Sequence, residues 1–313
     1  MTVAPSGLLE RARGGDKRAT ARLLSVVEND EPGAAEALRA LYPLTGHAEI
    51  VGITGPPGGG KSTLVNRLAG AYRATHDRVA VVAVDPSSPF TGGAILGDRI
   101  RMRERFLDEG LFIRSMASRG HAGGLARATS RIVNVLDALG YRVVLVETVG
   151  VGQEEVEVVR VADTVCLVTV PGLGDDIQAI KAGVLEIADV LVVNKADRPG
   201  ADETARDLAQ MLSLGAPRIA WKPPIIRTVA ATGEGTDELV AAIAKHRAWA
   251  AESGEREARR RASARAEVED LLRVSLVRRL RDRLGVERVD SAIARVAERA
   301  IDPYAAVDEL LRE

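Results

Sequence analysis

Cysteine and aromatic residues are scarce in this chain. Its 313 residues include one cysteine, Cys166, and only 3% are Phe, Trp or Tyr. A single thiol excludes an internal disulfide and suits a reducing compartment, so we expect a cytoplasmic protein. Cys166 lies within the apolar run Val165–Val170, which indicates a buried core thiol rather than a nucleophile.

Long apolar runs and an excess of charge of one sign are also lacking. The longest apolar runs, such as Val79–Val84, are far too short to span a bilayer, and no signal-like apolar segment begins the chain. Charged residues make up 28% of the chain, with a net charge of -1. Because nothing in this balance demands a nucleic-acid or membrane surface, we expect neither as a partner.

Short Val- and Ile-rich runs alternate with longer helical stretches between residues 47 and 250. Such alternation predicts an α/β fold with a mainly parallel central sheet flanked by helices. In this architecture ligands bind at the carboxyl ends of the strands. The expected strands are Glu49–Thr54, Val79–Asp85, Leu111–Ser115, Val143–Glu147, Thr164–Val170, Val190–Asn194 and Ile225–Val229.

A glycine-rich loop follows the first of these strands. Residues 55–63, GPPGGGKST, fit G-x-x-x-x-G-K-[ST], the phosphate-binding loop of a P-loop NTPase. Glycines let consecutive backbone N–H groups turn inward around a phosphate, and the following helix adds the positive end of its dipole. We expect Lys61 to reach the β- and γ-phosphates, Ser62 to hold Mg²⁺ and Thr63 to support the α-phosphate. The predicted phosphate-binding residues are Gly58, Gly59, Gly60, Lys61, Ser62 and Thr63.

Acidic residues at or near strand ends form a candidate Mg²⁺ site with Ser62. Glu147 ends an apolar run, where many GTP-binding proteins carry Asp, and its carboxylate would act on the metal through water. Asp85 ends a neighbouring strand and Asp98 lies in a glycine-rich loop, so these three carboxylates can converge on one ion. The N–H of Gly150 would sense the γ-phosphate. A helix cap or a solvated loop acid stays open as the alternative for Asp98.

A guanine-reading motif follows the strand that ends at Asn194. The run NKAD (194–197) matches N-K-x-D, and the carboxylate of Asp197 can accept hydrogen bonds from the N1–H and the 2-amino group of guanine. Adenine offers neither group there, so the motif predicts selectivity for GTP and GDP. The Lys195 stem would lie over the base and Asn194 would tie neighbouring loops together. Further on, Ala231 lies in a turn whose backbone N–H groups could approach the guanine O6.

Both ends of the chain differ from this central region. Residues 1–46 show helical spacing and predict an N-terminal helical extension, and residues 251–313 predict a charged C-terminal helical extension. In the latter, one apolar stripe either caps the nucleotide domain or pairs with a second copy of itself. The stripe recurs every four residues, at Val268, Leu272, Leu276, Leu280 and Leu284, with Leu271 beside it.

Together these motifs resemble the MeaB/ArgK family, the GTPases associated with methylmalonyl-CoA mutase. The resemblance covers nearly the whole chain and rests on GITGPPGGGKST (52–63), DPSSPFTGGAILGDRIRM (85–102), RGHAGGLA (119–126), ETVGVGQ (147–153), PGLGDDIQAIKAG (171–183) and NKAD (194–197).

This resemblance implies a GTP-hydrolysing chaperone that gates adenosylcobalamin delivery to an acyl-CoA mutase and protects that mutase. It implies switch segments at 85–102, 147–160 and 171–183, with Asp85, Asp98 and Glu147 around Mg²⁺ and the attacking water. Lys181 would come to the active site when the partner docks. It also implies homodimers made through residues 251–313. The chain carries no D-x-H-x-x-G run, so the cobalamin would belong to the partner.

Two other functions remain as alternatives. One is a phosphotransferase that uses ATP on a transport protein or a small molecule, against which NKAD argues because it reads guanine. The other is a GTPase that inserts nickel, which wants clustered cysteines and histidines. Here Cys166 is alone and the histidines are scattered, at His47, His76, His121 and His246.

Overall fold

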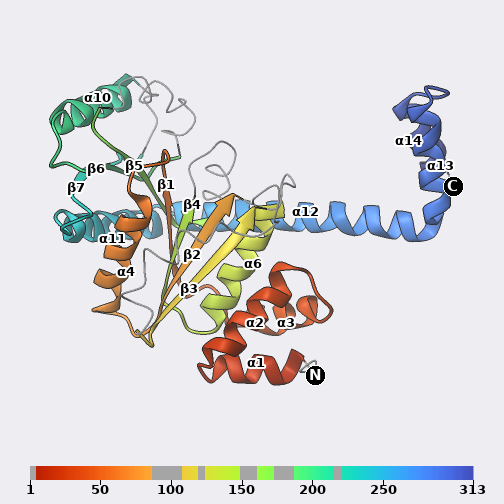
Figure 1. Cartoon of the computed structure of the whole chain (residues 1–313), viewed down its shortest axis with the longest axis horizontal. Coiled ribbons are helices and arrows are strands. Elements are labelled where there is room, and N and C mark those ends of the chain that lie inside the picture. Colours follow the sequence, from red (N-terminus) through yellow and green to blue (C-terminus); the bar gives the residue numbers. More distant parts are fainter. Residues whose placement is uncertain are drawn as a thin grey trace. The chain divides into compact units, whose positions relative to one another are not determined.

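A parallel sheet lies at the centre of the fold. The computed structural model describes residues 5–86, 108–118, 124–148, 161–172, 187–214 and 220–312. Its seven-stranded sheet has the order β3-β2-β4-β1-β5-β6-β7, and every neighbouring pair is parallel (Figure 1). The strands are β1 (Glu49–Thr54), β2 (Val79–Pro86), β3 (Leu111–Ser118), β4 (Val143–Thr148), β5 (Thr164–Thr169), β6 (Val190–Asn194) and β7 (Ile225–Thr228).

All seven strands predicted from the sequence are therefore confirmed, as is the α/β P-loop fold. Their bounds differ by a few residues at most, the largest change being β3, which continues to Ser118. Every residue of β4, β5 and β6 is buried, which matches their nearly continuous apolar sequences. Strands covered on both faces lose the alternation of polar and apolar residues, so the apolar runs themselves mark the strands.

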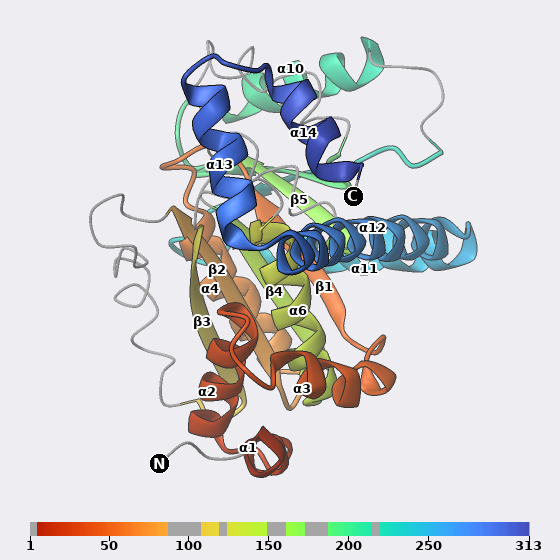
Figure 2. The same cartoon turned by 90° about the vertical axis from the view of Figure 1, so that its right-hand side faces the viewer.

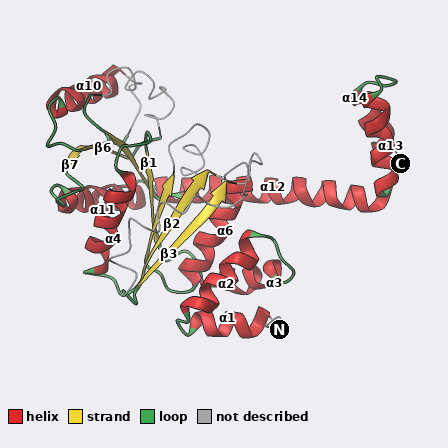
Figure 3. Ribbon diagram, in the orientation of Figure 1, coloured by secondary structure: helices red, strands yellow, loops and turns green. Residues whose placement is uncertain are grey.

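Helices cover both faces of the sheet. On one face, α4 (Lys61–Arg73) and α11 (Thr236–Glu252) pack against alternate residues of β1, β4 and β5. On the other, α6 (Gly124–Ala138) packs on β2 and β4, and α10 (Ala201–Leu214) packs on β5 and β6. Figure 2 shows α6 and α4 on opposite sides of the strands, and Figure 3 shows the same layers by element type. No helix in the described ranges is both long and apolar enough to cross a bilayer.

Three N-terminal helices pack on the face that carries α6. They are α1 (Pro5–Arg13), α2 (Lys17–Glu28) and α3 (Ala34–Leu41), followed by the 3-10 turn η1 (Tyr42–Leu44). Leu23, Leu24 and Val27 of α2 are fully buried in the same apolar cluster as α6. Consequently residues 1–260 form one compact unit, and the N-terminal helices share its core.

Residues 261–313 form a second compact unit. The 30-residue helix α12 (Glu255–Leu284) spans the boundary, and α13 (Val286–Ala297) and α14 (Pro303–Leu311) follow it. The predicted stripe falls on α12, where Val268, Leu272 and Leu276 are exposed. Val274 and Val277 are exposed too, although they lie outside the four-residue repeat, so the exposed apolar surface of α12 is wider than a single stripe.

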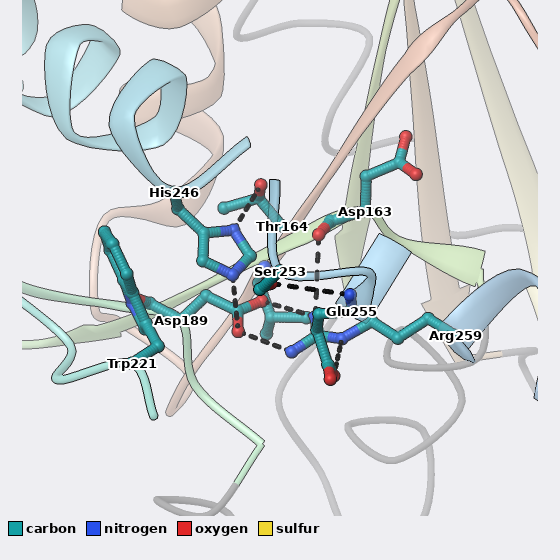
Figure 4. A network of polar contacts seen from close by, with 9 residues as sticks. Asp163, Thr164, Asp189, Trp221, His246, Ser253, Glu255 and Arg259 are labelled. Carbon is teal, nitrogen blue, oxygen red and sulfur yellow. Dashed lines mark hydrogen bonds and ion pairs between the residues drawn. The ribbon is translucent and has the colours of Figure 1, made fainter. Parts of the chain in front are cut away.

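A polar network lies at the amino-terminal ends of β5 and β6 (Figure 4). The carboxyl ends of the strands, where ligands bind in this architecture, are at the opposite edge of the sheet. At its centre is Asp189, whose side chain is only 5% exposed. Its two carboxylate oxygens accept hydrogen bonds from the guanidinium of Arg259, at 2.7 and 2.8 Å, and one of them also accepts from Val165 N. The backbone carbonyl of Asp189 accepts from Trp221 Nε1 at 2.8 Å.

Fully buried His246 completes this network. Its Nδ1 lies 2.9 Å from Thr164 Oγ1 and its Nε2 lies 3.2 Å from a carboxylate oxygen of Asp189. Both tryptophans of the chain, Trp221 and Trp249, pack on its ring. Burial raises the pKa of Asp189, but the bonds from Arg259 and the contact with His246 outweigh it and hold that pKa below its ordinary value of 3.8. Arg259 lies in the first turns of α12, so the network fastens the start of that helix, within residues 1–260, to the sheet.

Candidate functional site

The glycine loop leads from the central strand β1 into α4. Gly60 has φ +82°, and a Cβ there would lie 2.4 Å from Asn194 Nδ2, so only glycine fits. Helix α4 begins at Lys61, whose buried Nζ donates to Gly55 O at 2.6 Å and to Pro56 O at 2.9 Å. The positive end of the α4 dipole and the charge of Lys61 thus lie at the same turn. Both attract an anion such as a phosphate.

Ser62, the second residue of α4, lies side by side with Glu147. The Ser62 hydroxyl donates to Glu147 Oε1 at 2.6 Å, and both residues are buried. They come together because β4, which carries Glu147, pairs with β1, which leads into the loop before Ser62. A hydroxyl and a carboxylate oxygen side by side are the ligands that Mg²⁺ prefers, so these residues fit the predicted ion.

Of the other predicted metal and switch residues, only the backbone of Asp85 lies in the described part. Asp85 is in β2, which pairs with β4 beside Glu147, but its side chain is not among the described ones. Asp98, Gly150 and Lys181 lie wholly outside the described residues. Among the residues that are described, no group of three or more His, Cys, Asp or Glu side chains could hold a metal. Of the three carboxylates predicted to converge on the metal, only the side chain of Glu147 is described, so their convergence stays a prediction.

Asn194 joins three loops at the carboxyl edge of the sheet. Its buried amide donates from Nδ2 to Gly59 O at 2.8 Å in the glycine loop. Its Oδ1 accepts from Thr228 Oγ1 and from Ala230 N, both at 3.1 Å, at the end of β7. The side chain thus satisfies its polar groups with backbone and hydroxyl partners, which fixes the loop after β6 against the loops after β1 and β7.

Lys195 and Asp197 follow in the same loop. Lys195 has φ +56°, a left-handed conformation that is uncommon for a residue with a side chain. Its Nζ donates to Gly58 O at 2.8 Å, so its stem crosses from the loop after β6 to the glycine loop. Asp197 is exposed and so is Thr63, in the first turn of α4. An unusual backbone conformation held by such contacts is typical of binding sites.

Arg67 is a residue that the sequence analysis missed. It lies in α4, and its Nε donates to Ala230 O at 2.9 Å, while Nη2 donates to Ala231 O. The loop after β7, which contains the predicted site residue Ala231, is therefore held by α4 as well as by Asn194. No sequence motif signals this contact, because its acceptors are backbone carbonyls.

Comparisons with known proteins agree with this geometry. The model of a family described as methylmalonyl Co-A mutase-associated GTPase MeaB matches residues 20–284. The chain belongs to the MeaB family. Within it, a protein of Pyrococcus abyssi classed among the GTPases is 50% identical over 309 residues, which cover 98% of this chain and 95% of that protein.

More distant relatives of the MeaB family also match. The GTPase ArgK of Escherichia coli is 38% identical over 252 residues, covering 77% of this chain and 75% of its own length. The mitochondrial methylmalonic aciduria type A homolog of Mus musculus is 33% identical over 267 residues, covering 84% of this chain and 64% of its own length. A crystal structure named as an LAO/AO transport system kinase has a TM-score of 0.72 and 26% identity, over 99% of this chain and 98% of that one. The resemblance stated from the motifs is confirmed.

Proposed function

We propose that this MeaB-family protein is a GTP-hydrolysing chaperone for a cobalamin-dependent acyl-CoA mutase, with methylmalonyl-CoA mutase as the first candidate. GTP binding and hydrolysis would gate adenosylcobalamin delivery to the mutase and protect it. The observation that carries the proposal is the pair of hydrogen bonds by which Asn194 and Lys195 join the loop 194–197 to the glycine loop. A guanine-type motif bonded directly to a phosphate loop supports recognition of one guanine nucleotide by both.

In this proposal the chain's own residues bind and orient the nucleotide. Lys61 would exchange its carbonyl acceptors for β- and γ-phosphate oxygens, which are stronger acceptors because they are charged. Ser62 and Glu147, with Asp85 and Asp98, would hold Mg²⁺. The ion, when bound, neutralises charge on the phosphates. The N–H of Gly150 would sense the γ-phosphate, and Lys181 would come to the active site when the partner docks.

Base selectivity rests on the loops after β6 and β7. Asp197 would accept from the N1–H and the 2-amino group of guanine, the stem of Lys195 would cover the base, and the N–H of Ala231 would approach O6. An adenine base would leave the carboxylate unpaired, which costs affinity. The exposure of Asp197 and Ala231 supports this assignment, because both are open to a ligand.

We further propose residues 1–46 as an N-terminal extension, 47–250 as the GTPase domain and 251–313 as a dimerisation extension. The exposed apolar side chains of α12 support self-association, because a soluble helix rarely leaves so many uncovered. No nucleic-acid or membrane partner is proposed, and buried Cys166, whose thiol pKa is raised by burial, suits a reducing cytoplasm.

The test measures GTP and ATP hydrolysis with and without a cobalamin-dependent acyl-CoA mutase. We expect slow, GTP-selective turnover that the mutase raises severalfold, and loss of the GTP preference in Asp197→Ala. GTP turnover that ignores every mutase tried would remove the partner and keep the nucleotide site. Efficient ATP turnover with phosphate transfer to an added acceptor would favour the phosphotransferase, which the name of the LAO/AO relative suggests for that protein.

A further inference from the structure

Arg67 joins the helix of the phosphate loop to the loop after β7. It lies six residues after Lys61 on α4 and is half-buried. Its guanidinium donates to two successive carbonyls, Ala230 O at 2.9 Å through Nε and Ala231 O through Nη2. Two parallel donors on a planar, permanently charged group fix the direction of what they bind more strictly than one donor does.

The first of these bonds sets the direction of one N–H group. In a planar trans peptide the carbonyl and the following N–H point in opposite directions, so holding Ala230 O toward α4 turns the N–H of Ala231 away from α4. The neighbouring N–H groups are already used. Ala230 N donates to Asn194 Oδ1 at 3.1 Å, and the N–H groups of Thr232 and Gly233 both donate to Val229 O.

The N–H of Ala231 therefore differs from its neighbours. It donates to no acceptor in the part of the chain that the structure describes, and the residue is exposed. The loop is bonded on one side by Asn194, which also belongs to the base-reading loop, and on the other by Arg67. Because the loop is held from two sides, its one outward N–H group keeps a fixed direction. It can therefore act as a preorganised hydrogen-bond donor to a ligand.

We propose that Arg67 is a positioning residue that sets selectivity for the oxygen at C6 of guanine. Arg67 does not touch the base. It holds the peptide between Ala230 and Ala231 so that the N–H of Ala231 donates to O6, separately from Asp197, which recognises the N1–H and the 2-amino group. This inference rests on the proposed binding of guanine nucleotides and adds a residue to that site.

Two nucleotide analogues separate the two kinds of recognition. In 6-thioguanosine diphosphate only the C6 oxygen is replaced, by a larger and weaker sulfur acceptor, while N1–H and the 2-amino group remain. In inosine diphosphate only the 2-amino group is missing. The preference for GDP over the thio analogue thus reports on the loop after β7, and the preference for GDP over inosine diphosphate reports on Asp197.

The experiment titrates both analogues, GDP and ADP into the full chain and into the variants Arg67→Ala and Arg67→Lys. For Arg67→Ala we expect the preference for GDP over the thio analogue to shrink about five- to tenfold, the size of one lost hydrogen bond. The preference over inosine diphosphate should stay within about twofold. Arg67→Lys, which keeps the charge but offers a single donor nitrogen in place of two, should give an intermediate thio preference.

Arg73→Ala is the matched control, because Arg73 lies on the same helix and pairs with Asp108 instead of the loop after β7. It should lower stability without changing either preference. Equal loss of both preferences in Arg67→Ala, or an unchanged thio preference in a folded variant, would overturn the inference. If the wild-type chain binds ADP as tightly as GDP, the proposed function fails instead, and the two failures are told apart by that one titration.

Discussion

At the scale of single residues, Gly60 has no room for a methyl group. In Gly60→Ala the new Cβ would lie 2.4 Å from Asn194 Nδ2, and φ +82° adds backbone strain. We expect the bond from Asn194 to Gly59 to break, with a loss of about 2–4 kcal/mol in the free energy of unfolding. GDP affinity should fall with it, because Asn194 joins the two nucleotide loops. Urea unfolding and GDP titration measure the two effects.

Gly58→Ala is the control for this substitution. Gly58 also has a positive φ, +75°, but a Cβ there would meet nothing within 4 Å. It should cost only the strain of the left-handed conformation, about 1–2 kcal/mol, and leave Asn194 in place. Equal losses in the two variants would show that the contact with Asn194 has no role.

The site was predictable from the sequence where its chemistry resides in consecutive side chains. Lys61 and Ser62, and Asn194 and Lys195, lie in short motifs, and the structure brings both motifs together at one edge of the sheet. The role of Arg67 was not predictable. Its acceptors are carbonyls more than 160 residues away. Every residue has a backbone carbonyl, so the sequence does not indicate which carbonyl a side chain will bind.

At the scale of elements, β6 has a polar group at each end, Asn194 in the site and Asp189 in the buried network. We expect Asp189→Asn to lower the free energy of unfolding by about 3–5 kcal/mol at pH 7, because Arg259 loses its buried carboxylate partner and keeps only the more exposed Glu255. Both tryptophans lie in this network, so their emission should shift as well. The matched control is Glu269→Gln, which removes an exposed pair with Arg265 and should change nothing measurable.

The same carboxylate predicts a pH dependence. The folded-state pKa of Asp189 is lowered below 3.8, so its contribution to stability is fully present above about pH 4 and is lost as pH falls through the folded-state value. Wild-type stability should therefore drop in this acid range, and the stability of Asp189→Asn should drop less. Urea unfolding between pH 3 and pH 7, at roughly half-unit steps, compares the slopes. Parallel curves for the two proteins would contradict the assignment.

The positions of the strands were predictable, and their order was not. Runs such as Val143–Val146 are buried on both faces and so are apolar throughout, which marks them locally. The insertion of β4 between β1 and β2 depends on pairings between residues about 60 to 90 positions apart, such as Val79 with Val143 and Glu49 with Val143. No local pattern records which of these pairings forms.

At the scale of the whole molecule, α12 predicts the oligomeric state. Leu272 and Leu276 are each 56% exposed, and a second copy would cover them. Each leucine that leaves an interface costs about 1.5–3 kcal/mol, and a two-fold interface loses four when both are replaced. We therefore expect a dimeric wild type and a monomeric Leu272→Glu/Leu276→Glu variant, measured by light scattering after gel filtration.

Arg281→Glu is the control for the added charge. It changes the net charge by the same two units, and at about 100° per residue it lies on the opposite side of α12 from the two leucines. It should remain dimeric, because the interface depends on apolar burial on one side of the helix. Both variants should keep basal GTP hydrolysis, since the candidate site lies within residues 1–260. Equal dissociation in both variants would contradict an interface that depends on apolar burial on one side of α12. A monomeric wild type would contradict the dimer itself, and the exposed leucines would then be the first candidates for the surface that meets the mutase.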